Sequence, residues 1–353
     1  MLPMWKVKRE VLRAKDHVRF PFIALSAPLR RSWHDLRKSQ MSRYTTGQLA
    51  AGPNVVLYLL YQPQGLLASS VETCRYFAAK GFSVFIVSNA PLGDSDRDML
   101  CEHSFGVLER ENFGYDFGGY RDGILHLLDA GVQMNKLLIM NDSVWFPTFA
   151  GEDFLDHVLA AKTDLYGAVL SQRKQHMEQR HLQSYAVSFG KKLLASVDFA
   201  QFWRKLLLSS NREWTIRNCE VQLSVHFRKL GYSLGARWGF ESLGSVLDQL
   251  SDLELKDLLR LEAELERKRA PTINALIATY GSETWRSKVT EFVDSRKFRK
   301  QIMLLHPAAL SQMNFPFMKK SREPFYSVLR PLYAKWLADK CQPTMLKELA
   351  KWD

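Results

Sequence analysis

Cysteine is scarce in this sequence, and none of it occurs in closely spaced pairs. The 353 residues include four cysteines, Cys74, Cys101, Cys219 and Cys341, without a Cys-x-x-Cys spacing among them. Disulfide frameworks and zinc sites are normally built from such pairs. We therefore expect neither, and this cysteine usage indicates a reducing compartment.

Long apolar segments are lacking as well. No run approaches the roughly 20 apolar residues needed to cross a bilayer, and the first residues contain no apolar block with a small-residue cleavage site. These absences predict a cytoplasmic chain without a transmembrane helix or signal peptide. A Gly-x-x-x-x-Gly-Lys-Ser/Thr loop is also missing, which argues against a P-loop kinase or ATPase.

Acidic residues are few at both ends of the chain. The net charge is +12, of which residues 1–40 carry +7 and residues 294–353 also carry +7, so that −2 remains for residues 41–293. Both ends mix the basic residues with aromatic ones such as Trp33 and Trp336. This mixture suits an anionic membrane surface or nucleic acid, and solvated helices packed on the body would also show it. The near-neutral centre argues against nucleic acid.

What the sequence does contain is an alternation of apolar runs and amphipathic segments. Continuous apolar runs are typical of buried parallel strands, and apolar residues at three- and four-residue steps are typical of helices. The expected strands are 54–61, 83–87, 105–108, 137–140 and 165–170, and the expected helices are 70–80, 120–131, 152–162 and 219–230. This order predicts an α/β fold with a mostly parallel sheet flanked by helices.

The same pattern divides the chain into three parts. Residues 1–53 are a basic N-terminal segment that ends in a polar linker from residue 41 onward. Residues 54–243 hold the alternating pattern, and residues 244–353 are helical and basic. The sequence leaves open whether the last part is a separate domain or wraps around the first.

Two polar segments lie where predicted strands end. Glu111-Asn112-Phe113-Gly114-Tyr115-Asp116-Phe117-Gly118-Gly119 is interpreted as a glycine turn that lets the backbone approach a ligand. Its spacing differs from the dinucleotide pattern Gly-x-Gly-x-x-Gly. Asn141-Asp142-Ser143 follows an apolar run and places a carboxylate at the carboxyl edge of the sheet, where open α/β sheets bind ligands. Together the two segments suggest a nucleotide-sugar site.

Asp142 is the candidate metal ligand. Its carboxylate offers a hard oxygen for Mg²⁺ or Mn²⁺ that also binds a diphosphate, with Asn141 and Ser143 as neutral helpers. Hydrogen bonding at a strand end is the structural alternative. Because only one acid is present, the use of a metal stays open.

Further candidates lie downstream. Glu220 is in the first turn of a predicted helix, where it either favours the helix dipole or acts as a general base. His181 precedes an apparent strand and is a candidate for the cleft, and a structural histidine is the alternative. Lys319 and Lys320 follow Phe315-Pro316-Phe317-Met318 and are candidates for phosphate contacts or for a solvated turn.

These residues together resemble the rhamnan synthesis protein F family and, more broadly, glycosyltransferases of the GT-A fold. The resemblance covers about residues 54–240, with a weaker part at 306–325. Asn112-Phe113-Gly114-Tyr115-Asp116-Phe117-Gly118-Gly119 is similar to the family's Asn-x-Gly-x-Asp-x-Gly-Gly. Asn141-Asp142-Ser143 is similar to its Asn-Asp-Ser, which stands where most GT-A enzymes carry Asp-x-Asp.

A third segment extends the resemblance. Glu220-Val221-x-Leu223, followed by Gly231-Tyr232, is similar to the Glu-Asp-x-x-Leu…Gly-Tyr element of inverting GT-A enzymes. The acid of that element deprotonates the acceptor hydroxyl. Cys219 replaces the first acid of the family's pair, so the role of base falls to Glu220 alone.

The resemblance implies an inverting hexosyltransferase of cell-surface polysaccharide assembly, such as O-antigen or capsule biosynthesis. The expected donor is a nucleotide diphosphate sugar, with dTDP-rhamnose favoured, and the expected acceptor is a lipid-linked glycan. Glu220 is the expected catalytic base. The expected donor contacts are Asn89, Asn112, Gly114, Asp116, Gly118, Asn141, Asp142, Ser143 and Lys319, and the expected acceptor contacts are His181, Ser184 and Tyr185, with Mg²⁺ or Mn²⁺ at Asp142 left open.

Other function classes remain. A non-catalytic GT-A-like binding or scaffold subunit of a polysaccharide assembly complex is favoured by the single acid at Asp142 and by Cys219. A nucleic-acid-binding protein comes third. A membrane-held acceptor would explain the basic, aromatic ends, and it predicts a peripheral position at the inner face of the cytoplasmic membrane, with other polysaccharide-assembly enzymes as further partners.

Overall fold

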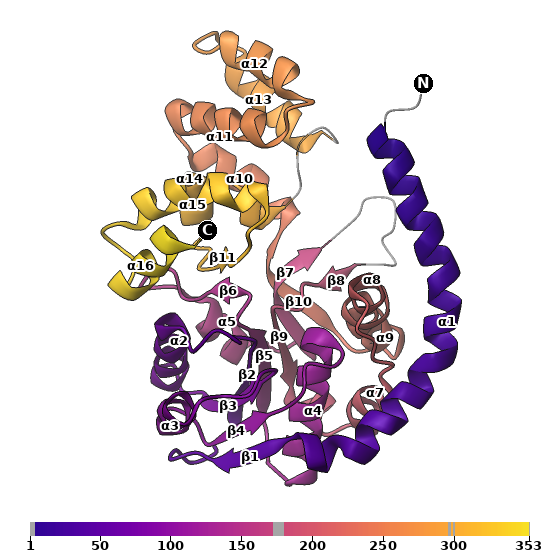
Figure 1. The fold of residues 1–353 in the computed structure, drawn as a ribbon. Helices are drawn as coiled ribbons and strands as arrows, with labels where there is room; N and C mark the ends of the chain where they lie inside the picture. Colours follow the sequence, from indigo (N-terminus) through magenta and orange to yellow (C-terminus); the bar gives the residue numbers. More distant parts are fainter. Residues whose placement is uncertain (1–3, 172–179, 296–297, 299–300, 353) are drawn as a thin grey trace.

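The core of the molecule is a nine-stranded, mostly parallel sheet (Figure 1). The computed structural model describes residues 4–171, 180–295, 298 and 301–352. Along the sheet the order is β1-β4-β3-β2-β5-β9-β7-β10, and β8 pairs with β7. The strands are β1 (Arg43–Thr46), β2 (Asn54–Leu60), β3 (Ser83–Ser88), β4 (Gly106–Glu109), β5 (Lys136–Asn141), β7 (Leu165–Ser171), β8 (His181–Leu182), β9 (Ala186–Gly190) and β10 (Leu234–Gly239). The strands β1, β8 and β9 run antiparallel to their neighbours.

The order in which strands are added to the sheet reverses at β2, which makes this strand the switch point of the sheet. From β2 the chain moves to β3 and then β4 on one side, and it continues from β5 on the other side. Such a reversal opens a crevice at the carboxyl ends of the two central strands, where α/β sheets bind their ligands. The carboxyl ends of β2 and β5 therefore mark the expected site, as the sequence indicated.

Helices cover both faces of the sheet. One layer consists of α4 (Tyr115–Asp129), α6 (Lys191–Leu194), α7 (Val197–Lys205), α8 (Arg212–Thr215) and α9 (Val221–Lys229), with a π-helical turn, η2 (Ile216–Glu220), between α8 and α9. The other layer holds α2 (Ala68–Ala79), α3 (Asp94–Glu102) and α5 (Phe154–Ala160). Alternate residues of β2 belong to the two cores, Leu57 to one and Tyr58 to the other, and both are fully buried. This two-sided burial explains the unbroken apolar runs of the strands, and the α/β prediction is confirmed.

The C-terminal region is helical, as predicted. It comprises η3 (Phe240–Ser242), α10 (Leu243–Gln249), α11 (Asp252–Leu265), α12 (Ala270–Ala278), α13 (Trp285–Asp294), η4 (Ile302–Leu304), α14 (Pro307–Gln312), α15 (Pro324–Leu337) and α16 (Pro343–Lys351). Most of its buried apolar residues form one continuous cluster with residues of the sheet, and Leu261, Leu265, Leu304 and Leu329 form a smaller cluster of their own. Phe317, for example, stacks on Phe146 with 4.8 Å between ring centroids. The first two α-helices of this region are separate, because α10 ends at Gln249 and Ser251 caps the start of α11.

A second, two-stranded sheet ties this region to the central sheet. It consists of β6 (Val144–Trp145) and β11 (Met318–Lys319), which pair antiparallel. Lys319 lies opposite Val144, and the Lys320 amide donates to the Ser143 carbonyl at 2.8 Å. The C-terminal region thus returns to the end of β5, although 176 residues separate Ser143 from Lys319.

The N-terminal part of the chain is the long helix α1 (Met4–Met41), which curves along the outside of the α4, α7 and α8 layer (Figure 1). Pro21 and Pro28 lie inside it, and prolines within a helix bend it. The region predicted as a linker contains β1, which pairs with β4 at the edge of the sheet. None of the helices in the described ranges is both long and apolar enough to cross a membrane.

One sequence expectation was wrong in detail, and another is not tested by the structure. The helix predicted from residue 120 begins five residues earlier, at Tyr115, so Gly118 and Gly119 are helical rather than part of a turn. A Cβ on Gly119 would lie 2.3 Å from Leu59, which shows that glycine lets α4 pack closely on β2. The basic residues at 296, 297, 299 and 300, counted in the charge of the C-terminal end, lie outside the described residues.

Candidate active site

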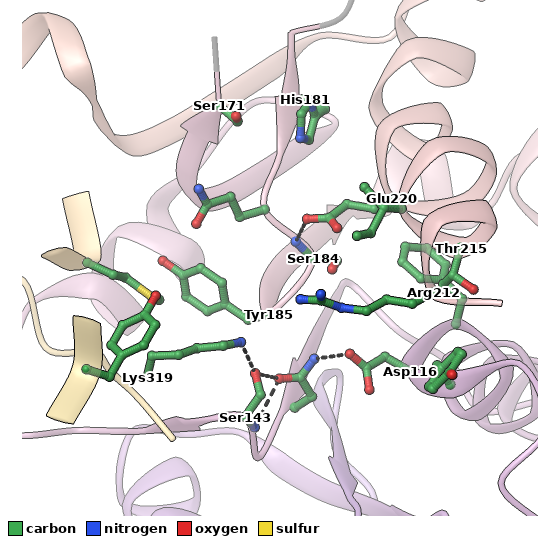
Figure 2. A pocket seen from close by; sticks show the side chains of 17 residues that line it. Asp116, Ser143, Ser171, His181, Ser184, Tyr185, Arg212, Thr215, Glu220 and Lys319 are labelled. Atoms are coloured by element: carbon green, nitrogen blue, oxygen red, sulfur yellow. Dashed lines mark hydrogen bonds between the residues drawn. The ribbon is translucent and has the colours of Figure 1, made fainter. Parts of the chain in front are cut away.

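A cavity of about 410 Å³ lies at the carboxyl ends of β5 and β7, beside the switch point of the sheet. Side chains from α4, β5, β8, α8, η2 and β11 line it (Figure 2). The lining residues are Tyr115, Asp116, Phe117, Asn141, Ser143, Ser171, His181, Gln183, Ser184, Tyr185, Arg212, Thr215, Ile216, Glu220, Met303, Lys319 and Tyr326. Eight of the thirteen residues predicted for the site are among them.

A row of hydrogen bonds crosses the floor of the cavity (Figure 2). The Lys319 ammonium donates to Ser143 Oγ at 2.8 Å, and this hydroxyl lies 2.5 Å from Asn141 Oδ1. Asn141 Nδ2 in turn lies 3.0 Å from Asp116 Oδ2. The row joins a cation to a carboxylate through two neutral side chains, which fixes the position of each member.

Glu220 faces this row from the opposite wall (Figure 2). It is the last residue of the π-helical turn and the first flanking residue of α9. Its Oε1 accepts a hydrogen bond from the Ser184 backbone amide at 3.2 Å. Single π-helical turns within α-helices often occur at functional sites. Its neighbour Cys219 is fully buried, and burial raises the pKa of that thiol to about 12, so Cys219 cannot replace a carboxylate at the cavity.

The site perturbs the ionisation of its charged groups. Burial raises the pKa of Asp116 to about 6, with Asp142 and Glu220 adding to the rise and Lys319 opposing it. Burial also lowers the pKa of Lys319, against the opposite effect of Asp116 and Glu220. Strongly shifted groups inside a cavity are typical of functional sites.

Sequence reasoning missed Arg212 and Tyr115. Arg212 is the first residue of α8, and Figure 2 shows its guanidinium pointing into the cavity. A cation at the N-terminus of a helix opposes the helix dipole, so the local sequence does not favour this placement. Tyr115 is 41% exposed and has a φ of 52°, a left-handed conformation that is strained for a side chain of this size.

Tyr185 contributes a polar group that lacks a protein partner. Its side chain lines the cavity and is 5% exposed. Its hydroxyl forms no hydrogen bond to any residue that the structure describes. Buried polar groups are normally paired, so this hydroxyl is available to a bound molecule.

The remaining five predicted residues lie outside the cavity lining. Gly114 and Gly118 shape the entry to α4: Gly114 has a φ of +82°, and a Cβ on Gly118 would lie 1.9 Å from the Phe113 carbonyl. Asn89 Oδ1 accepts a hydrogen bond from Arg110 at 2.7 Å, and Asn112 Oδ1 is buried without a partner among the described residues. Their roles as donor contacts stay predictions.

The side chain of Asp142 points to the opposite side of the strand end from those of Asn141 and Ser143, as expected for successive residues of a strand. Its Oδ2 accepts hydrogen bonds from the Tyr61 backbone amide at 3.0 Å and from Gln62 Nε2 at 2.9 Å. Within the described ranges no three or more His, Cys, Asp or Glu side chains are grouped as a metal site. A divalent ion here would be held by the Asp142 carboxylate, with diphosphate oxygens and water as the remaining ligands.

Comparison with known proteins supports the sequence interpretation. The family described as rhamnan synthesis protein F matches residues 84–239. Its resemblance to this chain is confirmed over that segment. The segment includes Asn89, the glycine segment, Asn141-Asp142-Ser143, Glu220 and most of the sheet.

Individual relatives extend the comparison. An uncharacterized protein, y4gN, of Sinorhizobium fredii (strain NBRC 101917 / NGR234) is 28% identical over the whole of this chain and 93% of its own length. Virulence protein VirA of Vibrio anguillarum is 29% identical over 37% of this chain and 42% of its own length. The mannosyltransferase PcManGT from Pyrobaculum calidifontis, solved with GDP-Man and Mn²⁺, aligns over 92% of this chain and 93% of its own at 12% identity, with a TM-score of 0.34.

Proposed function

We propose that this chain is a glycosyltransferase that moves a sugar from a nucleotide diphosphate donor to an acceptor hydroxyl by single displacement. One observation carries the proposal: Glu220 and Arg212 come from one wall of a cavity beside the switch point of the sheet, and Lys319 comes from the other wall. Such a transfer needs a base for the acceptor and positive charge for the departing diphosphate. The family match over residues 84–239 supports the same reaction class.

The diphosphate is proposed to lie between Lys319 and Arg212. Lys319 is held by Ser143, and Arg212 offers a planar fork of donors that suits phosphate oxygens. Negative charge grows on the diphosphate as the bond to the sugar breaks, so fixed cations stabilise the transition state more than the ground state. Lys319 and Arg212 supply positive charge from the protein's own side chains, so no step is routed through a metal ion.

The sugar is proposed to contact Asp116 and Tyr185. Asp116 retains acceptor capacity beyond its hydrogen bond from Asn141, and the Tyr185 hydroxyl is without a partner among the described residues. Hydroxyl groups of a sugar satisfy both. Rhamnose carried on dTDP is the donor that the family's name favours, and a lipid-linked glycan is the acceptor that we propose.

Glu220 is proposed to take the proton of the acceptor hydroxyl as its oxygen forms a bond to the anomeric carbon. The bond between that carbon and the diphosphate oxygen breaks on the opposite face, so the anomeric centre is inverted. The Ser184 amide holds one carboxylate oxygen, which leaves the other to accept the proton. His181 and Ser184 line the same side of the cavity and are the proposed acceptor contacts.

The test is Glu220→Gln, compared with Glu213→Gln on the neighbouring turn. Glutamine keeps the acceptor for the Ser184 amide but cannot take a proton. We expect transfer to fall by about 10²–10⁴-fold, while calorimetry shows unchanged binding of the nucleotide sugar. Glu213 is exposed and does not line the cavity, so its variant should retain the parent rate. Equal rates for the parent and Glu220→Gln would remove Glu220 from the reaction.

The same assay separates the remaining hypotheses. If the parent binds a nucleotide sugar but neither transfers nor hydrolyses it, the chain is a binding or scaffold subunit. We expect transfer to persist in excess EDTA, because Lys319 and Arg212 supply the positive charge. Loss of transfer in EDTA that Mn²⁺ restores would show that a metal is required.

A further inference from the structure

Helix α1 packs on the body of the protein with one face and leaves an apolar face exposed. The inward face places Ala27 and His34 against the body, where both are buried. Arg31 donates to the Lys205 carbonyl at 2.9 Å, and His34 Nε2 lies 2.9 Å from Asp122 Oδ2. These contacts fix the rotation of the helix, so its opposite face points to solvent.

That opposite face carries a continuous row of large apolar side chains. They recur at steps of three and four residues, which places them on one stripe of an α-helix. They are Phe22, Leu25, Leu29, Trp33 and Leu36, with exposed fractions of 69%, 77%, 74%, 56% and 79%. Scattered exposed apolar residues are ordinary, but a contiguous stripe of this kind marks an interaction surface. We call these five residues the outer stripe.

Arginines flank the outer stripe on one side. Arg19, Arg30 and Arg37 are exposed and lie about 100° around the helix from its centre. No described residue forms an ion pair with any of the three, and Arg37 stacks on Trp33 at 4.4 Å. The one acid in the described side chains of α1, Asp35, is paired with Arg121 at 2.6 Å.

A hollow of about 480 Å³ opens beside this row of arginines. Arg19, Phe22 and Arg30 line it from α1, and residues 209–211 line it from the loop before α8. Two guanidinium groups together with the hydroxyls of Ser209 and Ser210 are suited to a phosphate group. The apolar side chain of Phe22 lies at the same hollow.

We propose that the outer stripe and its arginines form a docking face for an anionic phospholipid surface, with a lipid phosphate in the hollow. The stripe enters the boundary between head groups and acyl chains, as amphipathic helices do, and Arg19, Arg30 and Arg37 meet the anionic head groups. Charge decides between a lipid and a second copy of this face, since a second copy would present arginines and, among the described side chains of α1, only the paired carboxylate of Asp35. The proposal concerns binding alone and holds whether or not the chain transfers a sugar.

The docking face also lies beside the cavity. Residues 209–211 line the hollow, and Arg212 and Thr215, next along the chain, line the cavity. A membrane held at the hollow would therefore lie close to the wall that carries Glu220. This placement gives a lipid-linked acceptor a short route to the proposed base.

The experiment is flotation of the full chain with vesicles of phosphatidylcholine alone or mixed with phosphatidylglycerol. We expect the parent to float with the mixed vesicles only and to be released by salt, because screening weakens surface charge interactions. Arg19→Glu with Arg30→Glu and, separately, Leu25→Ser with Leu29→Ser should each reduce the bound fraction by about tenfold or more. Thermal unfolding checks that each variant is folded.

Matched controls test whether vesicle binding depends on this face or on exposed charged and apolar residues anywhere on the surface. Arg267→Glu with Lys288→Glu gives the same charge change on exposed residues of the C-terminal region. Val197→Ser with Leu253→Ser removes apolar residues that are 69% and 64% exposed elsewhere. Both controls should float as the parent does. The proposal would be overturned if folded α1 variants floated as well as the parent, or if the parent did not bind the mixed vesicles. It would also be overturned if the parent formed a dimer instead of binding vesicles and the Leu25→Ser/Leu29→Ser change abolished that dimer.

Discussion

Asp116 is a buried carboxyl group at the point where the donor is proposed to bind, and burial disfavours its charged form. Burial raises its pKa from the ordinary 3.8 to about 6. A raised pKa means that the folded state holds the proton more tightly than the unfolded state does. The contribution of Asp116 to stability is therefore fully present below about pH 3.8, and it is lost as the pH rises through about 6.

Asp116→Asn should accordingly stabilise the protein at pH 7.5 and have little effect at pH 4. The amide keeps the acceptor for Asn141 Nδ2 and is never charged. Thermal unfolding at the two pH values measures this difference, and Asp98→Asn, which changes an exposed carboxylate, should show none. The same Asp116→Asn variant should bind a nucleotide sugar more weakly. An equal stability change at both pH values would show that the Asp116 carboxyl is not perturbed.

The sequence predicted some residues of the site better than others. Asn141, Ser143 and Glu220 were foreseeable, because each follows a local pattern that ends a strand or begins a helix. Lys319 was named from its neighbours, but its position depends on the pairing of β11 with β6 across a long stretch of chain. Arg212 belongs to a helix of four residues, which leaves no periodic pattern to detect.

At the scale of elements, β2, β3, β4, β5 and β7 were predicted within one or two residues because most of their residues are buried on both faces of the sheet. No bounds were predicted for β10, whose first four residues are only partly buried. The short strands β1, β6 and β11 were missed. They have two to four residues, so their structure comes from their partners rather than from their own sequence. The glycine segment was read as a turn because glycine is rare within helices. Packing against β2 overrides that preference at Gly119 and Gly123.

Helices α1 and α4 are joined by an ion-pair cluster centred on Asp122. This side chain is 1% exposed, and its Oδ2 lies 2.6 Å from Arg110 Nε and 2.9 Å from His34 Nε2. Burial raises the pKa of Asp122, but the hydrogen bond from His34 and the charges of Arg110 and Lys38 outweigh it and hold the pKa well below its usual range. The stabilisation is therefore present above about pH 4 and is lost as the pH falls.

Asp122→Ala should destabilise the protein by about 3–5 kcal/mol, because it leaves the guanidinium of Arg110 buried without its partner. Urea unfolding at neutral pH measures the loss. Hydrogen exchange should also speed up in residues 30–41 of α1, whose contact with α4 is removed. Asp129→Ala on the same helix breaks an exposed pair with Arg204 and should cost at most about 1 kcal/mol. Similar losses in the two variants would show that the cluster does not join the helices.

At the scale of the whole molecule, the sequence left the relation of residues 244–353 to the sheet unsettled. Composition cannot reveal which helix faces pack on a sheet, because an amphipathic helix needs only some apolar partner. The partner here is the sheet itself, through Phe317, Trp238 and Phe146. The boundary at residue 243 stays a prediction, although the apolar core is continuous across it.

Glu348, near the end of the chain, links this region to the site. From α16 it accepts hydrogen bonds from the Ser69 amide at 2.9 Å, the Ser69 hydroxyl at 2.5 Å and the Trp145 indole at 2.9 Å. Ser69 begins α2, and Trp145 is the residue of β6 that pairs with Met318. The last helix thereby holds the two-stranded sheet that positions Lys319.

Glu348→Ala should therefore reduce both stability and donor binding. It leaves three donors of two buried residues, the Ser69 amide and hydroxyl and the Trp145 indole, without their acceptor. Each donor that water cannot reach costs about 1–3 kcal/mol, and β6 and β11 become free to shift. We expect a lower unfolding temperature and a higher KM for the nucleotide sugar, with a smaller change in kcat because Glu220 is untouched. Lys347→Ala, at an exposed neighbour on α16, should leave both quantities unchanged. A destabilised Glu348→Ala variant with the parent KM would show that Lys319 keeps its place without the C-terminal helix.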